Sequence, residues 1–132
     1  MREIKFGGKR LDGGGWFYGD LLQAIYSDGR HTTLIMEQSP VALSFRVDPA
    51  TVVQYTGFDD VNANKLYHKD IIEHQVYLHN DYITAVGVIE WHEKGYWYVA
   101  DKNGKYVGFV GGVDLPEKIG TMVDNPELLE AV

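Results

Sequence analysis

The chain has 132 residues, enough for one domain or two small fused lobes with a hydrophobic core. It contains no cysteine, which excludes a disulfide scaffold, a thiol nucleophile and a zinc site with cysteine ligands. The net charge is −7, and all of the excess negative charge lies after residue 57, where there are six basic and thirteen acidic side chains. A surface of this sign repels phosphate backbones, which disfavours nonspecific binding of nucleic acids.

Hydropathy along the chain predicts neither a signal peptide nor a membrane-spanning helix. The first residues, Met1–Phe6, contain no apolar segment of the kind that a signal peptide requires. No apolar run approaches the roughly 20 residues that a membrane-spanning helix needs. We therefore expect neither export nor insertion into a membrane.

Short strands separated by turns dominate the first half of the predicted structure. Residues 9–15 form a predicted turn, in which three consecutive glycines allow positive φ angles. Asp48 precedes Pro49 and is placed to cap the amides of a short helical turn. The strands expected in this half are residues 16–22, 31–36, 41–47 and 52–56.

The second half begins with a polar connector, residues 57–64, in which residues 59–62 could form a helical turn. Residues 115–118 are predicted as a further helical turn just before the last strand. The connector at 101–104 contains Asn103-Gly104, the strongest short signal for a hairpin. The strands expected in this half are residues 70–76, 83–91, 96–100, 106–110 and 119–122.

These elements predict a mostly β fold. Residues 1–57 are expected to form a β-rich segment, and residues 58–132 a small SH3-like barrel with five strands, the two together making one compact unit. Closure into a barrel would remove the exposed edges that promote aggregation. Residues 124–129 are predicted to form a helical turn, and Leu128 and Leu129 are expected to dock on this chain or on a neighbouring one.

Several segments, in order along nearly the whole chain, resemble the YopX family of phage and prophage proteins. The most specific is the stretch from Val47 to Asp60, which contains Val-Asp-Pro-Ala-Thr-Val and Gln-Tyr-Thr-Gly-Phe-Asp-Asp. The other matching segments are Arg2–Phe6, Trp16–Leu22, Leu66–Ile72, Gly87–Trp91, Ile119–Gly120 and Asp124–Leu129.

The resemblance implies a phage or prophage origin, a location in the host cytoplasm and a β-rich fold. It brings no established activity, so it transfers no catalytic residues. Two departures bear on turns: Lys69 stands where the family usually has glycine, and Ala63-Asn64 replaces a more usual Asn-Gly. Since glycine permits positive φ, Lys69 suggests a changed local turn.

His68, Asp70 and His74 are weak candidates for metal ligands. Imidazole and carboxylate groups bind zinc and iron, and on a regular strand these three side chains would share one face. Their spacing matches no metal signature, so surface histidines are the preferred interpretation. No catalytic residue and no cofactor are assigned from the sequence.

Five large aromatic residues are expected to form an interaction surface. Trp91, Tyr96, Trp97, Tyr98 and Tyr106 lie on three successive predicted strands. Tyr96 and Tyr98 share one face of their strand and Trp97 takes the other, because side chains alternate. One face is expected to belong to a core and the other to a contact with another protein chain.

The preferred hypothesis is a non-enzymatic phage accessory protein that acts through protein–protein contact and self-association. Its partners would be further copies of the chain and a host or phage protein. One alternative is a protein that binds single-stranded nucleic acid on its aromatic residues, which the acidic second half disfavours. A second alternative is a small metal-dependent hydrolase that uses the residues near 68–79.

Overall fold

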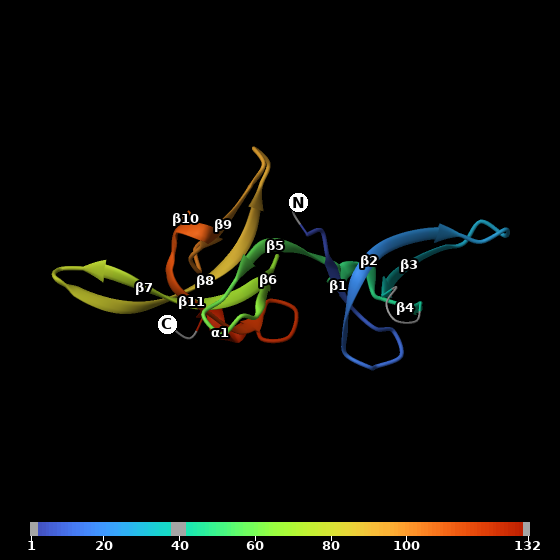
Figure 1. Ribbon diagram of the computed structural model, residues 1–132, viewed down its shortest axis with the longest axis horizontal. Coiled ribbons are helices and arrows are strands. Elements are labelled where there is room, and N and C mark those ends of the chain that lie inside the picture. The colour runs from blue at the N-terminus through green and yellow to red at the C-terminus, as the bar shows by residue number, and fades with distance from the viewer. Residues whose placement is uncertain (1–2, 38–41, 131–132) are drawn as a thin grey trace. The chain divides into compact units, whose positions relative to one another are not determined.

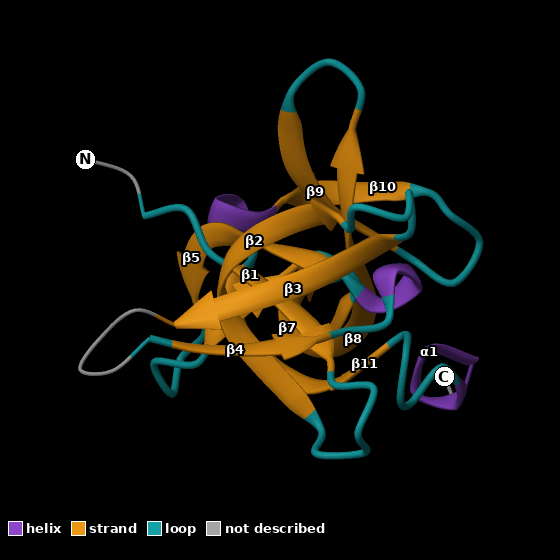
Figure 2. Cartoon of the chain, turned by 90° about the vertical axis from the view of Figure 1, so that its right-hand side faces the viewer, coloured by secondary structure: helices purple, strands orange, loops and turns teal. Residues whose placement is uncertain are grey.

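A computed structural model describes residues 3–37 and 42–130 of the chain (Figure 1). The chain divides into two compact units, Met1–Tyr55 and Thr56–Val132. Strands account for most of the described residues, and the helices among them are three short segments (Figure 2). In this part of the chain, no helix has the length and apolar character needed to cross a bilayer. The predicted mostly β fold is confirmed.

The first unit is an antiparallel sheet with the strand order β4-β3-β2-β1-β5. Its strands are β1 (Phe6–Lys9), β2 (Trp16–Ile25), β3 (His31–Glu37), β4 (Leu43–Arg46) and β5 (Val53–Asp59). The four strands expected here are confirmed, although residue 41 of the third lies outside the described residues.

The helical turn expected at Pro49 is confirmed as η1 (Pro49–Thr51). The Asp48 carboxylate accepts a hydrogen bond from the backbone N–H of Ala50 at 3.0 Å, which satisfies one of the free amides at the start of the turn. Pro49 occupies the first helical position, where no N–H is needed.

The second unit contains an antiparallel sheet with the order β10-β9-β8-β7-β11. The end of β5 continues into this unit and pairs with β6 (Lys65–Tyr67). The strands of the sheet are β7 (Asp70–Leu78), β8 (Asp81–His92), β9 (Tyr96–Ala100), β10 (Tyr106–Phe109) and β11 (Asp114–Thr121). All five expected strands are present, with β9 at its predicted bounds.

The helical turn predicted at residues 115–118 is wrong, because these residues belong to β11. The short helix that precedes the last strand is η2 (Val110–Gly112) instead. The backbone N–H of Val61 donates to the carbonyl of Pro116 at 2.9 Å, so a loop distant in sequence holds this segment extended. The helical turn that residues 59–62 could have formed is absent: Asp59 ends β5, and residues 60–64 form a turn closed by a bond from Asp60 N to Asn64 O at 2.8 Å.

The sheet of the second unit has two edges, β10 and β11, and no closed barrel is formed by the strands of the described residues. The predicted SH3-like closure is therefore not confirmed. Pro116 and the loop bonds cover part of the β11 edge, which protects it from pairing with other chains.

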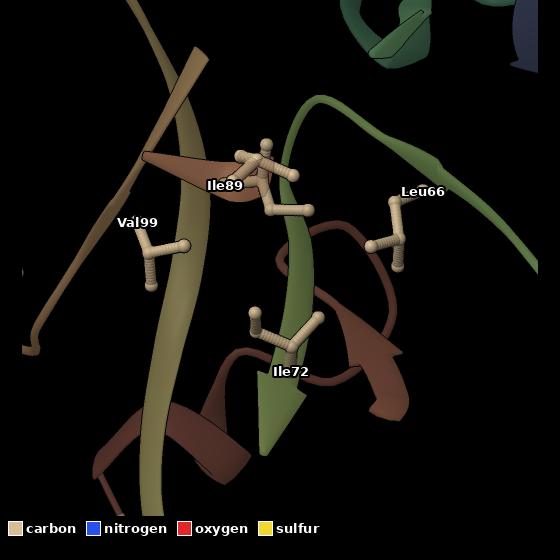
Figure 3. Close-up of a cluster of buried hydrophobic side chains, with 5 residues drawn as sticks. Leu66, Ile72, Ile89 and Val99 are labelled. Atoms are coloured by element: carbon tan, nitrogen blue, oxygen red, sulfur yellow. The ribbon is translucent and has the colours of Figure 1, made fainter. Parts of the chain in front are cut away.

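Buried side chains lie on both faces of this sheet. On one face, Leu66, Ile72, Ile89 and Val99 pack together with Val110 (Figure 3). On the other face, Leu129 from α1 (Glu127–Glu130) packs against a cluster whose remaining members are Ile71, Val88 and Ala100. Leu128 packs against the same cluster, so the expected docking of both leucines on this chain is confirmed.

Two residues at departures from the family pattern adopt left-handed backbone conformations: Lys69, where the family usually has glycine, and Ala63, where it usually has asparagine. Lys69 has a φ of 72° and Ala63 a φ of 64°. The changed turn expected at Lys69 is therefore wrong, since the backbone keeps the conformation that glycine would favour. A residue with a Cβ atom in this region carries a strain of about 1 kcal/mol.

Replacing Ala63 with glycine tests this strain. Ala63 is exposed, so Ala63→Gly removes the strain without creating a cavity. We expect the free energy of unfolding to rise by about 1 kcal/mol in urea denaturation of the full chain.

The matched control is Ala85→Gly, the same change in the interior of β8 at a negative φ. Glycine weakens a strand interior, so this variant should lose about 0.5–1 kcal/mol. A loss of stability in both variants would contradict the strain at Ala63.

Candidate functional site

The three candidate metal ligands do not converge on one point. His68 lies in the turn before β7, where the left-handed Lys69 breaks the alternation that would have aligned it with Asp70 and His74. Its Nε2 atom lies 3.7 Å from the Glu90 carboxylate. Across residues 3–37 and 42–130, no group of three His, Asp, Glu or Cys side chains is placed to hold a metal ion.

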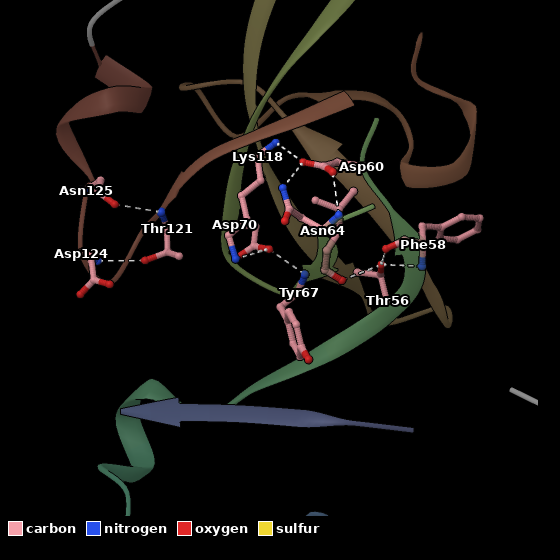
Figure 4. Close-up of polar contacts among 11 residues, drawn as sticks. Thr56, Phe58, Asp60, Asn64, Tyr67, Asp70, Lys118, Thr121, Asp124 and Asn125 are labelled. Carbon is pink, nitrogen blue, oxygen red and sulfur yellow. Dashed lines mark hydrogen bonds and ion pairs between the residues drawn. The ribbon is translucent and has the colours of Figure 1, made fainter. Parts of the chain in front are cut away.

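The Asp70 carboxylate is held by two neighbouring groups of the fold. It accepts a hydrogen bond from the backbone N–H of Tyr67 at 2.8 Å and lies 3.2 Å from the Lys118 ammonium (Figure 4). Burial raises the pKa of Asp70 to about 6, against the opposing effect of Lys118. The carboxylate thus closes the turn before β7 and ties it to β11.

Asp60 organises the neighbouring loop. Its carboxylate accepts backbone N–H bonds from Asn62, Asn64 and Lys118, each at 2.9 Å, and a side-chain bond from Asn64 at 3.2 Å (Figure 4). Burial alone would raise the pKa of Asp60, but these donors together lower it below its usual value. Both oxygens of the group are occupied by the fold itself.

His74 is 2% exposed, and its Nε2 atom has no hydrogen-bond partner among the described residues. Burial lowers the pKa of His74, because it penalises the charged imidazole. The charge of Asp114 opposes this lowering only in part. His74 lies in the sheet interior, so the interpretation as a surface histidine is wrong for this residue.

The predicted aromatic residues separate onto two faces of the sheet. In β9, Tyr96 and Tyr98 lie on one face and Trp97 on the other. Trp91 is paired with Trp97 in the neighbouring strand, with ring centroids 4.7 Å apart. Trp97 packs against the buried cluster of Figure 3, so its face is mainly core, with Trp91 half exposed at its rim.

The opposite face carries a continuous group of five rings, which we call the aromatic patch. It consists of His92, Tyr96, Tyr98, Tyr106 and Phe109. His92 stacks on Tyr96 with centroids 4.5 Å apart and an interplanar angle of 8°, and Phe109 meets Tyr96 edge-on at 5.3 Å. Tyr106 and Phe109 are 51% and 55% exposed, so the outer part of the patch faces solvent.

A bulge in β10 creates the outer part of the aromatic patch. Tyr106 is opposite Ala100 and Phe109 is opposite Tyr98, with an irregularity in register between Tyr106 and Gly108. On a regular strand, residues 106 and 109 would point to opposite faces because they are three apart. The extra residue of the bulge brings both rings to the same face.

The negative charge of Glu90, next to Tyr98 of the patch, is paired with the positive charge of Lys69. Glu90 is the cross-strand partner of Tyr98, and its carboxylate lies 2.7 Å from the Lys69 ammonium. His68 and Lys69 lower the pKa of Glu90 although burial opposes them. The patch therefore presents apolar ring surface with hydroxyl groups and one imidazole, suited to contact with another molecule.

The sequence identified three members of the patch, Tyr96, Tyr98 and Tyr106, but did not assign His92 or Phe109 to it. His92 is opposite Tyr96 in the β8–β9 ladder, so a correct hairpin register would have placed it there. Phe109 depends on the bulge, for which the sequence offers only Gly108 as a signal.

The fold and the patch together define a two-unit, all-antiparallel β protein with an aromatic sheet face. A comparison with known families matches residues 5–130 to the family described as YopX protein. The chain belongs to the YopX family. A search of curated proteins finds no match.

The raised pKa of Asp70 predicts how stability depends on pH. Because the native pKa lies above the value of 3.8 in the unfolded chain, the native state binds the proton more tightly. Relative to Asp70→Asn, the wild type should therefore gain about 1 kcal/mol in free energy of unfolding as the pH falls from 7.5 to 5.

Urea denaturation of both proteins at several pH values measures this difference. Asparagine keeps an oxygen for the Tyr67 N–H bond, so the variant retains the turn. A difference that stays constant between pH 7.5 and 5 would show that native Asp70 titrates as it does in the unfolded chain.

Proposed function

We propose that this protein is a non-enzymatic accessory protein of a phage or prophage that acts in the host cytoplasm through protein–protein contact, including contact between its own copies. The observation that carries the proposal is the aromatic patch, with two half-exposed outer rings supported by three inner ones. Tyrosine and other aromatic residues are enriched in the energetically dominant centres of protein interfaces.

The patch favours a protein over a nucleic acid as its partner. Stacking of bases on such rings needs basic side chains to hold the phosphates, and the half of the chain that carries the patch has six basic and thirteen acidic residues. The same charge favours a partner whose contact surface is basic around an apolar centre.

We further propose that the second unit is related to SH3-like domains. Four strands, β7 to β10, follow one another as neighbours, then a 3-10 helix leads to β11, which returns to pair with β7. This order supports the relation even with the sheet open between β10 and β11. SH3-like folds host many functions, so the relation adds no activity by itself.

Capture from lysate by tagged protein, read by mass spectrometry, tests the role of the patch. The double variant Tyr106→Thr, Phe109→Thr removes the exposed rings and keeps strand-favouring residues in β10. We expect a partner that is captured by the wild type after nuclease treatment and whose recovery falls at least tenfold with the double variant.

The matched control is Val107→Thr, an exposed position in the same strand outside the patch, and it should capture as the wild type does. Equal capture by the double variant would contradict the role of the patch. Loss of capture only in Trp91→Thr would move the contact to the opposite face, and loss of every partner on nuclease treatment would favour nucleic acid.

A further inference from the structure

The β7–β8 hairpin extends beyond the rest of its sheet (Figure 1). The pairing of β11 with β7 reaches Gln75, and the pairing of β9 with β8 begins at Val88. The last three pairs of the hairpin, from Val76–Ile83 to Leu78–Asp81, therefore have no third strand among the described residues. We call residues 76–83 the hairpin end. Two-stranded ribbons are marginally stable in water unless a further surface covers them.

The hairpin end is apolar on both of its faces. Tyr77 and Tyr82 are cross-strand partners with ring centroids 5.0 Å apart, and they are 59% and 62% exposed. Leu78 and Ile83 point to the other face and are about half exposed. Large apolar side chains gathered at the end of a projecting hairpin are typical of a surface that another chain covers.

We infer that the hairpin end binds a second copy of this chain. This inference rests on the proposed function, of which self-association is a part, and assigns that contact to a surface separate from the aromatic patch. The patch remains free for a different protein.

Charge favours a second copy at this place. The chain carries a net charge of −7, so two copies repel each other over most of their second units. Between residues 76 and 83, Asp81 is the only Asp, Glu, Lys or Arg, and its Oδ1 atom accepts the backbone N–H of Tyr82 at 2.8 Å. The hairpin end is thus a segment where two acidic chains can meet with little repulsion.

The available area fits a two-fold contact. One face of the hairpin end, formed by Tyr77 and Tyr82 with Leu115 beside them, offers roughly 400 Å² per copy. A symmetric pair would therefore bury on the order of 800 Å², the size of a weak, reversible contact. Each copy would present the same surface, as a closed dimer requires.

A cleft at the base of the hairpin end adds a concave surface against which side chains of the second copy can pack. It has a volume of about 350 Å³ and is lined by Gln75, Tyr82, Asp114 and Leu115. Leu115 is 66% exposed and has a φ of 49°, an unusual backbone for leucine. Strained and exposed apolar residues occur at binding sites, where a partner covers them.

Sedimentation velocity over a range of concentrations tests the inference. We expect the wild type to dimerise and Tyr77→Thr, Tyr82→Thr to bind itself at least tenfold more weakly. Threonine suits a strand, so the hairpin is retained. The control Leu22→Thr, Ile25→Thr removes two exposed apolar side chains from β2 and should dimerise as the wild type does.

The patch variant Tyr106→Thr, Phe109→Thr separates this inference from the proposed function. It should still dimerise, whether or not it captures a partner. A monomeric wild type at every concentration, a dimer that survives the tyrosine changes, or a dimer lost only in the patch variant would each overturn the inference.

Hydrogen exchange of the unaltered protein gives a second test that does not depend on any variant folding. Exchange at high concentration should slow at residues 76–83 relative to low concentration. Slowing confined to residues 96–109 would place the contact on the aromatic patch and contradict the inference.

Discussion

The second unit depends most on the bond between the Asp60 carboxylate and the backbone N–H of Lys118, 2.9 Å long and joining residues 58 positions apart. The same carboxylate closes its own loop, so one side chain fixes both the loop and the edge strand that it covers. Lys118 then reaches Asp70, which holds the turn before β7. Because β11 is held in this way, β7 has a firm neighbour from Asp70 to Gln75.

The aromatic patch follows from strand geometry on this support. Alternation separates Tyr96 and Tyr98 from Trp97. The tryptophan packs against the cluster of Figure 3, while Tyr98 packs against the cluster on the other face and joins Tyr96 in the aromatic patch. The bulge in β10 then adds Tyr106 and Phe109 to the same side. Contact through such a face depends on complementary shape and apolar area. The carboxylates of Asp60 and Asp70 have a different role, because both accept backbone N–H bonds that hold loops in place.

Local patterns predicted the strands well and the long-range features poorly. β9 and its hairpin are predictable because a run of strand-favouring aromatic residues, Tyr96-Trp97-Tyr98, precedes Asn103-Gly104. Leu115–Lys118 was read as a helical turn because the bonds that extend it come from residues 60 and 61. The common face expected for the weak metal candidates His68, Asp70 and His74 is absent for a similar reason, since the left-handed φ of Lys69 interrupts the alternation on which it depended.

Hydroxyl-radical footprinting of the protein inside producing cells, compared with the purified protein, tests the central claim most directly. The account predicts that oxidation of Tyr106 and Phe109, half exposed in the isolated chain, falls several-fold in cells, while Leu11 in the first unit, 59% exposed, is oxidised equally in both. Equal oxidation of all three residues in cells and in the purified protein would contradict a protein contact through the aromatic patch.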